Sequence, residues 1–237
     1  MAALKKYRRI YRICPKGMDI PPKKKCLSDN DIKILLDGDI VVEEKIDGGI
    51  VGISWDHYNY RHMAIGKHNP ISTNENSKRF YGFNKWVYDN YEKVQKIPQG
   101  WTIFGKWMRS SHNIFYDLLP DYFMAFDIWD GYRYIDFDNK EKLLELIGFK
   151  MISTIYIGRV KGVKDIIGTV KKSQYSSFEN MEGVVVKNYK KGLMGKFVTR
   201  EFDDRMDEHW LEKPLIENRL ASFKDKKNKD KAMLEYE

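Results

Sequence analysis

Apolar and polar residues alternate, and β-branched residues accumulate, in several segments that we predict to be strands. These segments are 40–44, 50–55, 101–108, 122–129, 151–157, 183–187 and 196–199. Strands outnumber helices in this pattern, and the two do not alternate regularly. The sequence therefore predicts an α+β domain built on mainly antiparallel sheets.

Apolar residues recur at helical intervals in three further segments. The sets are Phe80, Phe83, Val87 and Val94; then Leu143, Leu144 and Ile147; then Val163, Ile166, Ile167 and Val170. A last helix is predicted over 203–220, interrupted by Pro214 and followed by a polar, Lys-rich tail. We therefore expect one domain over 1–202 and a short helical C-terminal extension over 203–237.

The composition is that of a globular chain. Its 237 residues are 42% hydrophobic and 14% aromatic, enough to bury a substantial core. No segment approaches the roughly 18 consecutive apolar residues of a membrane span, and the first residues lack the apolar run of a secretory signal. We expect a soluble monomer in the cytoplasm or elsewhere inside the cell, with no membrane partner.

The chain carries a net charge of +8, with its basic residues concentrated near both ends. They include Lys5, Lys6, Arg8, Arg9, Arg12 and Lys23 to Lys25 at the start, and Lys224, Lys226, Lys227, Lys229 and Lys231 at the finish. A polyanion such as nucleic acid fits this distribution, because neutralised phosphates release counterions. Basic ends that only aid solubility are the alternative.

Cysteine and histidine offer no metal-binding pattern. Cys14 and Cys26 form no CxxC motif and have no second pair, so we predict two free thiols. The five histidines show no ligand-like spacing, which argues against structural zinc. Any metal is expected to bind through carboxylates and phosphates.

No P-loop and no GxGxxG motif occurs in the chain, so a nucleotide would have to bind in another way. One candidate segment is Glu44-Lys45-Ile46-Asp47-Gly48, which follows an apolar strand. By itself it could be a hairpin turn, since Asp-Gly between two β-rich runs is a turn signal. Lys45 would then be an ordinary charge at a strand end.

Other motifs follow this segment in a particular order. They are Phe104-Gly105-Lys106-Trp107, Tyr122 to Asp127, Glu182-Gly183-Val184-Val185-Val186-Lys187 and Lys196-Phe197-Val198. Together they resemble the serial motifs of the covalent nucleotidyltransferases, and most closely those of the ATP-dependent RNA ligases of phages and their relatives. The resemblance runs from about Glu43 to Arg200 and is compatible with a viral origin.

The resemblance implies a fold and a reaction. The expected fold is an ATP-grasp-like domain of two mainly antiparallel sheets with flanking helices. The expected reaction joins a 5′-phosphate end to a 3′-hydroxyl end of RNA through an AMP-linked Lys45, using ATP and Mg²⁺ or Mn²⁺. An unperturbed lysine is neutral in only about one molecule in 2,500 at pH 7, so Lys45 needs activation. Lys187 and Lys196 would supply nearby positive charge and hold the α-phosphate.

The remaining site residues also come from the resemblance. Glu182, with Asp47, would hold the metal through carboxylate oxygens. Gly48 would let the backbone approach the nucleotide closely. The other residues expected to bind ATP are Ile46, Glu44 at the base edge, Phe126 stacked on the adenine, and Lys67 near a phosphate or the RNA end.

Lys106 departs from the family pattern, which has glutamate at this place to reach the ribose hydroxyls. A cation cannot accept the hydrogen bond that the carboxylate would accept. Either the ribose is held differently, or Lys106 contacts a phosphate, or the step is impaired. We expect weakened adenylylation.

Two other functions are compatible with the sequence. A minimal DNA ligase or another lysine nucleotidyltransferase would use the same nucleophile, although the residues after Lys196 are too few for the OB-fold of DNA ligases and capping enzymes. A catalytically impaired nucleic-acid-binding relative would bind strands without forming an AMP adduct.

Overall fold

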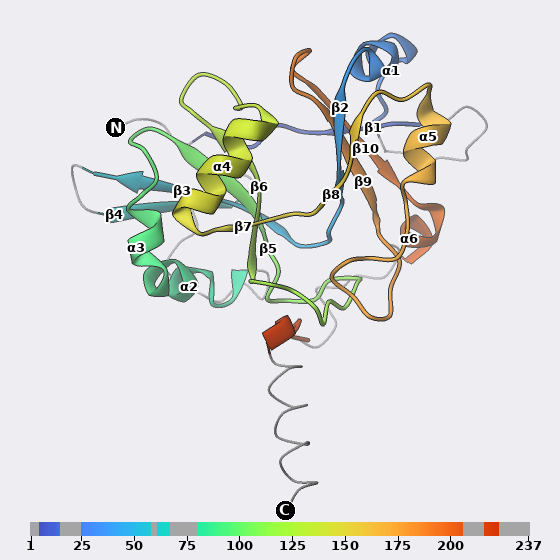
Figure 1. Cartoon of the computed structure of the whole chain (residues 1–237). Helices are drawn as coiled ribbons and strands as arrows, with labels where there is room; N and C mark the ends of the chain where they lie inside the picture. The colour runs from blue at the N-terminus through green and yellow to red at the C-terminus, as the bar shows by residue number, and fades with distance from the viewer. Residues whose placement is uncertain (1–4, 15–24, 58–60, 67–79, 206–215, 223–237) are drawn as a thin grey trace, which may run out of the picture.

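Two five-stranded sheets form the centre of the computed structural model, which describes residues 5–14, 25–57, 61–66, 80–205 and 216–222 (Figure 1). The first sheet has the order β1-β10-β9-β2-β8, and the second has the order β4-β3-β5-β6-β7. Only the β1–β10 and β6–β7 pairs are parallel among these neighbours. The prediction of an α+β fold with mainly antiparallel sheets is confirmed.

The strands of the first sheet are β1 (Tyr11–Arg12), β2 (Ile40–Glu44), β8 (Thr154–Gly158), β9 (Gly183–Asn188) and β10 (Leu193–Val198). Those of the second are β3 (Gly49–Asp56), β4 (Arg61–Gly66), β5 (Thr102–Trp107), β6 (Phe123–Trp129) and β7 (Lys150–Met151). The predicted strands correspond to these, except that 151–157 is divided between β7 and β8, in different sheets. The prediction missed β1 and β4.

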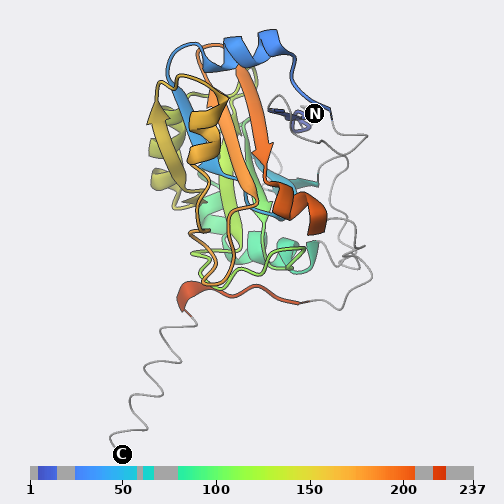
Figure 2. The same ribbon diagram turned by 90° about the vertical axis from the view of Figure 1, so that its right-hand side faces the viewer.

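Helices cover the outer face of each sheet (Figures 1 and 2). The elements α2 (Phe83–Asp89), α3 (Tyr91–Val94) and α4 (Phe137–Ile147) pack on the second sheet, while α1 (Asp29–Leu36) and α5 (Val163–Gly168) pack on the first. The three predicted helical segments are confirmed. The missed helix α1 begins with a capping box between Ser28 and Asp31.

The last predicted helix differs from the structure. Helix α6 (Arg200–Arg205) begins three residues before the predicted start, and 206–215 lie outside the described residues. The prediction is wrong for residues 216–220, which are not helical. Glu217 and Leu220 instead form β-bridges with Ser110 and Leu119, so this part of the predicted extension packs on the main domain.

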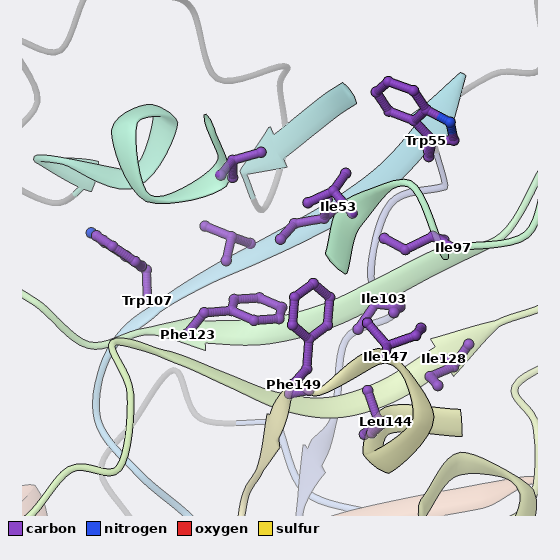
Figure 3. Packing of buried hydrophobic residues seen from close by; sticks show 14 of the residues in the cluster. Ile53, Trp55, Ile97, Ile103, Trp107, Phe123, Ile128, Leu144, Ile147 and Phe149 are labelled. Carbon is purple, nitrogen blue, oxygen red and sulfur yellow. The ribbon is translucent and has the colours of Figure 1, made fainter. Parts of the chain in front are cut away.

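Three apolar clusters divide the core by sheet face. Alternate residues of β6 illustrate the division: Phe123 and Ala125 face the helix-covered cluster, whereas Met124 and Phe126 face the cluster between the sheets. Figure 3 shows Phe123 within the helix-covered cluster. In β9, Val184 likewise packs under α1 and α5. The residues between these core positions are therefore presented to the space between the sheets.

Cys14 and Cys26 form a disulfide, so the prediction of two free thiols is wrong. The sequence did not predict the disulfide, because β1, the strand that precedes Cys14, forms by pairing with the distant strand β10. Arg12 forms a β-bridge with Cys26, and its backbone N–H donates to the Lys25 carbonyl at 2.9 Å. The two cysteines are brought together by this pairing.

Reduction of the disulfide is expected to destabilise the fold, because it restores the conformational freedom of the loop in the unfolded chain. A loop of this length corresponds to about 3 kcal/mol. Thermal unfolding with and without a reductant measures the effect. A Cys14→Ser/Cys26→Ser double variant should unfold at the lower temperature under both conditions; an equal unfolding temperature for the oxidised and reduced parent would contradict the expectation.

Candidate active site

Residues 45–48 carry the chain from one sheet to the other. Strand β2 pairs with β8 and β9, whereas β3, which starts at Gly49, pairs with β4 and β5. The hairpin interpretation of the Asp-Gly pair is therefore wrong. The Lys45 backbone N–H donates to the Gly183 carbonyl at 3.0 Å, so the crossing is tied to the start of β9.

Gly48 is required by packing at this crossing. A Cβ at this position would lie 2.8 Å from the Trp107 carbonyl oxygen and 2.5 Å from the Met108 sulfur. The predicted reason for glycine was the approach of a nucleotide. The structure shows a different reason, because the backbone at the end of β5 already occupies the space that a Cβ would need.

A pocket of about 220 Å³ opens between the sheets beside this crossing. Strands of both sheets and the N-terminal segment line it. Of the predicted nucleotide-binding residues, the structure places seven in its wall: Glu44, Lys45, Ile46, Lys106, Phe126, Lys187 and Lys196. Lys67 lies outside the described residues.

Lys45 forms an ion pair with Glu182 through Nζ and Oε1. Both side chains are largely buried, at 15% and 5% exposed. The second oxygen of Glu182, Oε2, is buried and has no hydrogen-bond partner among the residues that the structure describes. Burial raises the pKa of Glu182, and the charge of Lys45 opposes this shift. The Phe202 ring of α6 lies 6.0 Å from the Lys45 ammonium and covers this side of the pair.

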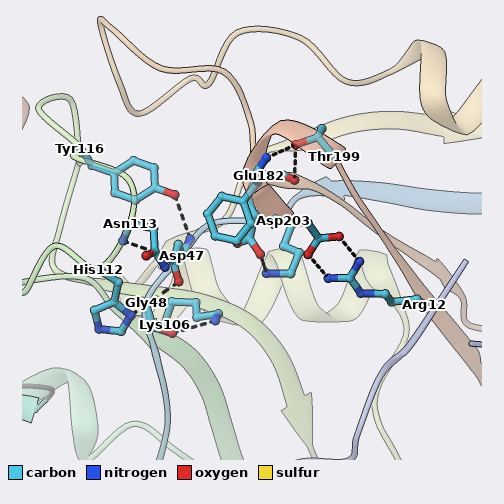
Figure 4. Close-up of polar contacts among 12 residues, drawn as sticks. Arg12, Asp47, Gly48, Lys106, His112, Asn113, Tyr116, Glu182, Thr199 and Asp203 are labelled. Atoms are coloured by element: carbon cyan, nitrogen blue, oxygen red, sulfur yellow. Dashed lines mark hydrogen bonds and ion pairs between the residues drawn. The ribbon is translucent and has the colours of Figure 1, made fainter. Parts of the chain in front are cut away.

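Asp47 is held by several donors (Figure 4). Its Oδ2 accepts hydrogen bonds from the backbone N–H and the side-chain amide of Asn113, both at 3.0 Å, and its Oδ1 lies 3.5 Å from Nδ1 of His112. Its own backbone N–H donates to the Tyr116 hydroxyl at 2.8 Å. Burial alone would raise the pKa of Asp47, but the hydrogen bond and charge of His112 outweigh it and lower the pKa. Asp47 is therefore an ionised anchor of the crossing.

Lys106 supports the same turn from β5. Its ammonium donates a hydrogen bond to the Gly48 carbonyl at 2.8 Å (Figure 4). The side chain also lines the pocket. The structure thus provides a contact that the sequence did not predict for the lysine that replaces the usual glutamate.

Lys187 is only 1% exposed and lies among acceptors. Its ammonium contacts Glu43 at 2.6 Å and Asp127 at 2.8 Å, and it donates to the Phe126 carbonyl at 2.8 Å. Three acceptors match the three N–H donors of an ammonium. The predicted contact with a phosphate would require one of these bonds to break.

A second buried lysine, which the sequence analysis missed, belongs to the same cluster. Lys140 of α4 is fully buried and donates to Glu43, to the Phe126 carbonyl at 3.0 Å and to the Tyr189 hydroxyl at 3.1 Å. Burial lowers its pKa, and Glu43 acts in the opposite direction. The sequence did contain a signal for its burial: Lys140 lies four positions before the core residue Leu144, and therefore on the same face of the helix.

The N-terminal segment forms one wall of the pocket. The Tyr7 hydroxyl donates to Asp127 Oδ2 at 2.5 Å, and its ring lies 5.0 Å from Phe126 and 5.1 Å from Phe104. Burial and the charge of Asp127 raise the pKa of Tyr7, so its hydroxyl stays protonated. The sequence analysis treated this segment only as a source of charge and missed Tyr7.

Glu44 has its own partners. Its carboxylate accepts hydrogen bonds from Ser173 Oγ at 2.5 Å and from the Gln174 backbone N–H at 3.1 Å. Burial raises its pKa, while these hydrogen bonds oppose the shift. The side chain is thus oriented by a neighbouring loop at the edge of the pocket.

Within the described ranges, no three His, Cys, Asp or Glu side chains lie close enough to bind a metal by themselves. The buried, unpartnered oxygen of Glu182 is a position where a cation could bind with the help of phosphate oxygens. The donor at this position fits a hard divalent ion. Over the same ranges, no helix is long and apolar enough to cross a membrane.

Comparison with known proteins shows the family of this chain. The family model described as RNA ligase matches residues 38–200, more than half of the chain. The chain belongs to the RNA ligase family. The match begins just before β2 and ends at the start of α6, so it contains both sheets except β1. No curated protein sequence matches the chain.

Solved structures of an RNA ligase from Naegleria gruberi share the fold. The ligase with PPi superposes with a TM-score of 0.61 at 14% identity, covering 84% of this chain and 60% of that one. A mutant of it with ATP and Mn gives a TM-score of 0.58 at 12% identity, covering 76% and 55%. The chain therefore spans little more than half the length of this ligase.

The buried cluster gives a stability prediction. Lys140→Met leaves Glu43 buried with one cation fewer, and loss of one partner of a buried pair costs about 3 kcal/mol. Urea unfolding measures the loss. Lys142→Met, at an exposed position of the same helix, is the matched control and should change stability little.

A double variant tests the cause. Glu43→Gln in the Lys140→Met background removes the uncompensated charge, so it should destabilise less than the sum of the single variants. Additive losses would show that the two side chains do not act on each other.

Proposed function

We propose that this chain is an ATP-dependent RNA ligase, which joins a 5′-phosphate end to a 3′-hydroxyl end through AMP linked to Lys45. The observation that carries the proposal is the position of Lys45. It lies at the crossing between the sheets, in the wall of a pocket. Its ammonium is paired with Glu182, whose second oxygen has no hydrogen-bond partner among the described residues. Membership of the RNA ligase family supports RNA as the substrate.

In the first step, the neutral Lys45 amine attacks the α-phosphorus of ATP. A phosphorus–nitrogen bond forms, the nitrogen loses one proton to solvent, and pyrophosphate leaves with the electron pair of the broken bond to its bridging oxygen. An oxygen of an RNA 5′-phosphate then attacks the AMP phosphorus, the phosphorus–nitrogen bond breaks, and the Lys45 nitrogen takes up a proton as it leaves. Finally, a 3′-hydroxyl attacks the activated phosphate, loses its proton, and releases AMP as the phosphodiester forms. Solved Naegleria ligase structures with ATP and Mn, and with PPi, support these reactants.

Lys45 must lose a proton before it can attack. In the structure its ammonium is paired with Glu182. A divalent cation bound by Glu182 Oε2 together with phosphate oxygens would compete for this carboxylate and favour the neutral amine. Glu182 is therefore the proposed metal ligand. Asp47, whose oxygens already accept from Asn113 and face His112, is assigned to holding the crossing in place, with a metal contact through water.

The two other lysines that were predicted to contact phosphate, Lys196 and Lys187, lie in different environments. Lys196, on β10 opposite Val185, lines the pocket and is the proposed partner of the α-phosphate, where charge builds during attack. Lys187 instead fixes the Phe126 backbone from beneath, so that the ring can face the adenine. We assign Lys187 a positioning role.

Intact mass after incubation with ATP and Mg²⁺ tests the proposal. The parent should gain the mass of one AMP, and Lys45→Ala should gain none, because only a lysine amine at this position can form the bond. Lys172→Ala, which removes an exposed lysine, is the control and should be labelled like the parent. An adduct of equal yield on Lys45→Ala would show that another residue is the nucleophile.

Substitution of Lys106 separates two explanations of this residue. If its bond to the Gly48 carbonyl holds the crossing, Lys106→Met and Lys106→Glu should both slow adenylylation, each by about tenfold for the loss of roughly 1.4 kcal/mol. Single-turnover formation of the AMP adduct measures the rates. A faster reaction or tighter ATP binding in Lys106→Glu would favour the other explanation, that the lysine only replaces a ribose-binding carboxylate.

A further inference from the structure

A second and larger cavity, of about 630 Å³, lies beside the nucleotide pocket. Three segments form it: the N-terminal residues, the loop after β6, and the turn between β9 and β10. Six of its lining side chains are cations and none is a carboxylate. The cations are Lys5, Lys6, Arg8, Arg133, Lys190 and Lys191.

Among the residues that the structure describes, carboxylates pair with only part of this positive charge. Arg133 lies 3.9 Å from Asp130, and Lys191 lies 2.6 Å from Asp37. For the other four cations, the described part of the chain contains no ion pair with a carboxylate. This concentration of charge favours an anionic ligand.

Arg8 connects the cavity with the nucleotide pocket, since it lines both. One of its nitrogens, Nη1, donates to the Gly192 carbonyl at 2.9 Å, and its guanidinium lies 4.6 Å from the Tyr134 ring centre. A guanidinium oriented in this way, at the border of two cavities, is suited to a phosphate oxygen.

Aromatic rings are interleaved with the cations. They are Trp129, Tyr132, Tyr134 and Tyr189. Tyr132 differs from the buried aromatic residues of the chain, because its side chain is 90% exposed. Asp130 Oδ1 holds the backbone here by accepting the backbone N–H groups of Tyr132 and Arg133, both at 2.8 Å. Burial cannot explain the position of this ring.

The cavity lies at the end of the sheet away from the nucleophile. The Lys45 backbone N–H donates a hydrogen bond to Gly183 at the start of β9. Asn188, which lines the cavity, is at the other end of the same strand. With a rise of about 3.3 Å per residue, the two ends are roughly 16 Å apart. Stacked nucleotides are spaced by about 3.4 Å along a strand, so several would fit in this distance.

We propose that this basic–aromatic cavity binds single-stranded RNA, a few nucleotides away from the end that is joined. Cations next to exposed rings are typical of surfaces that hold the backbone and stack unpaired bases. Duplex bases are already stacked, so a duplex would leave Tyr132 without a partner. The inference rests on the proposed function in that RNA is taken as the substrate.

Fluorescence anisotropy with a short labelled RNA tests the inference. The RNA carries a 5′-hydroxyl, so it cannot be adenylylated, and ATP is omitted. Tyr132→Ala should weaken single-strand binding by about 5- to 100-fold, the range measured for a lost base–aromatic stack. Lys6→Ala/Lys190→Ala, which removes two lining lysines, should weaken binding and reduce the slope of log K against log salt by about 1.4, from two phosphate contacts.

Matched controls remove side chains of the same types at positions outside the cavity. Tyr88→Ala replaces another exposed tyrosine, and Lys164→Ala/Lys172→Ala removes two exposed lysines. Both should bind RNA like the parent. All the variants should form the AMP adduct at the parental rate, because none touches the nucleotide pocket.

Three outcomes would overturn the inference: no binding of single-stranded RNA by the parent, parental binding by the cavity variants, or an equal loss for duplex RNA in Tyr132→Ala. The last would show that stacking plays no part. Failure of the proposed function is distinguishable, because it appears as absence of the AMP adduct in the parent and leaves the binding comparison intact.

Discussion

The crossing of the chain between two sheets at residues 45–48 is the constraint on which the candidate site depends. One strand of each sheet is fixed by its own pairings, so the connecting backbone has little freedom. Gly48 has no room for a side chain, and the Asp47 backbone and carboxylate are both bonded. Lys45 is thereby held at the pocket wall by elements that belong to both halves of the core. Pre-organisation of this kind reduces the entropy lost when a reacting group is positioned.

The lysines around the pocket have the same side chain but different chemistry, because their surroundings differ. Lys187 and Lys140 share the carboxylate of Glu43 and, with Asp127, form a charge-compensated cluster under Phe126. Such a cluster is costly to break, since removing one member leaves a buried charge. Within the described residues, Lys45 is paired with Glu182, whose second oxygen has no hydrogen-bond partner. The proposed exchange of this carboxylate from Lys45 to a ligand therefore does not require the Glu43 cluster to be broken.

The sequence predicted most of the strands, because the alternation of apolar and polar residues with period two is a local property. It also predicted that Lys45, Phe126 and Lys196 would share one site, and the structure brings them into one pocket. It could not separate the Asp-Gly hairpin from a crossing between sheets, since both have the same local sequence. That distinction depends on which strands pair with β2 and β3, and these are far apart along the chain.

Long-range contacts also explain the other differences. The partners of Lys187, Glu43 and Asp127, come from distant strands, so its buried environment left no local signal. Tyr7 reaches the pocket only because β1 pairs with β10. The disulfide and the bridge between Glu217 and Ser110 likewise join segments whose local sequence predicts loop or helix. Residues that act through such contacts were missed, whereas the motifs led to residues that line one pocket.

Sealing of a pre-adenylylated RNA strand by Lys45→Ala is the most direct test of the central claim that Lys45 carries AMP and is dispensable once the RNA end is activated. We predict that the variant fails to join a 5′-phosphate strand in the presence of ATP but joins the same strand when it is supplied as the 5′-adenylylated form, without ATP. Joining of both strands by Lys45→Ala would show that activation does not pass through this lysine. Failure on both strands, by a variant that folds like the parent, would contradict the assignment of Lys45 to the activation step alone.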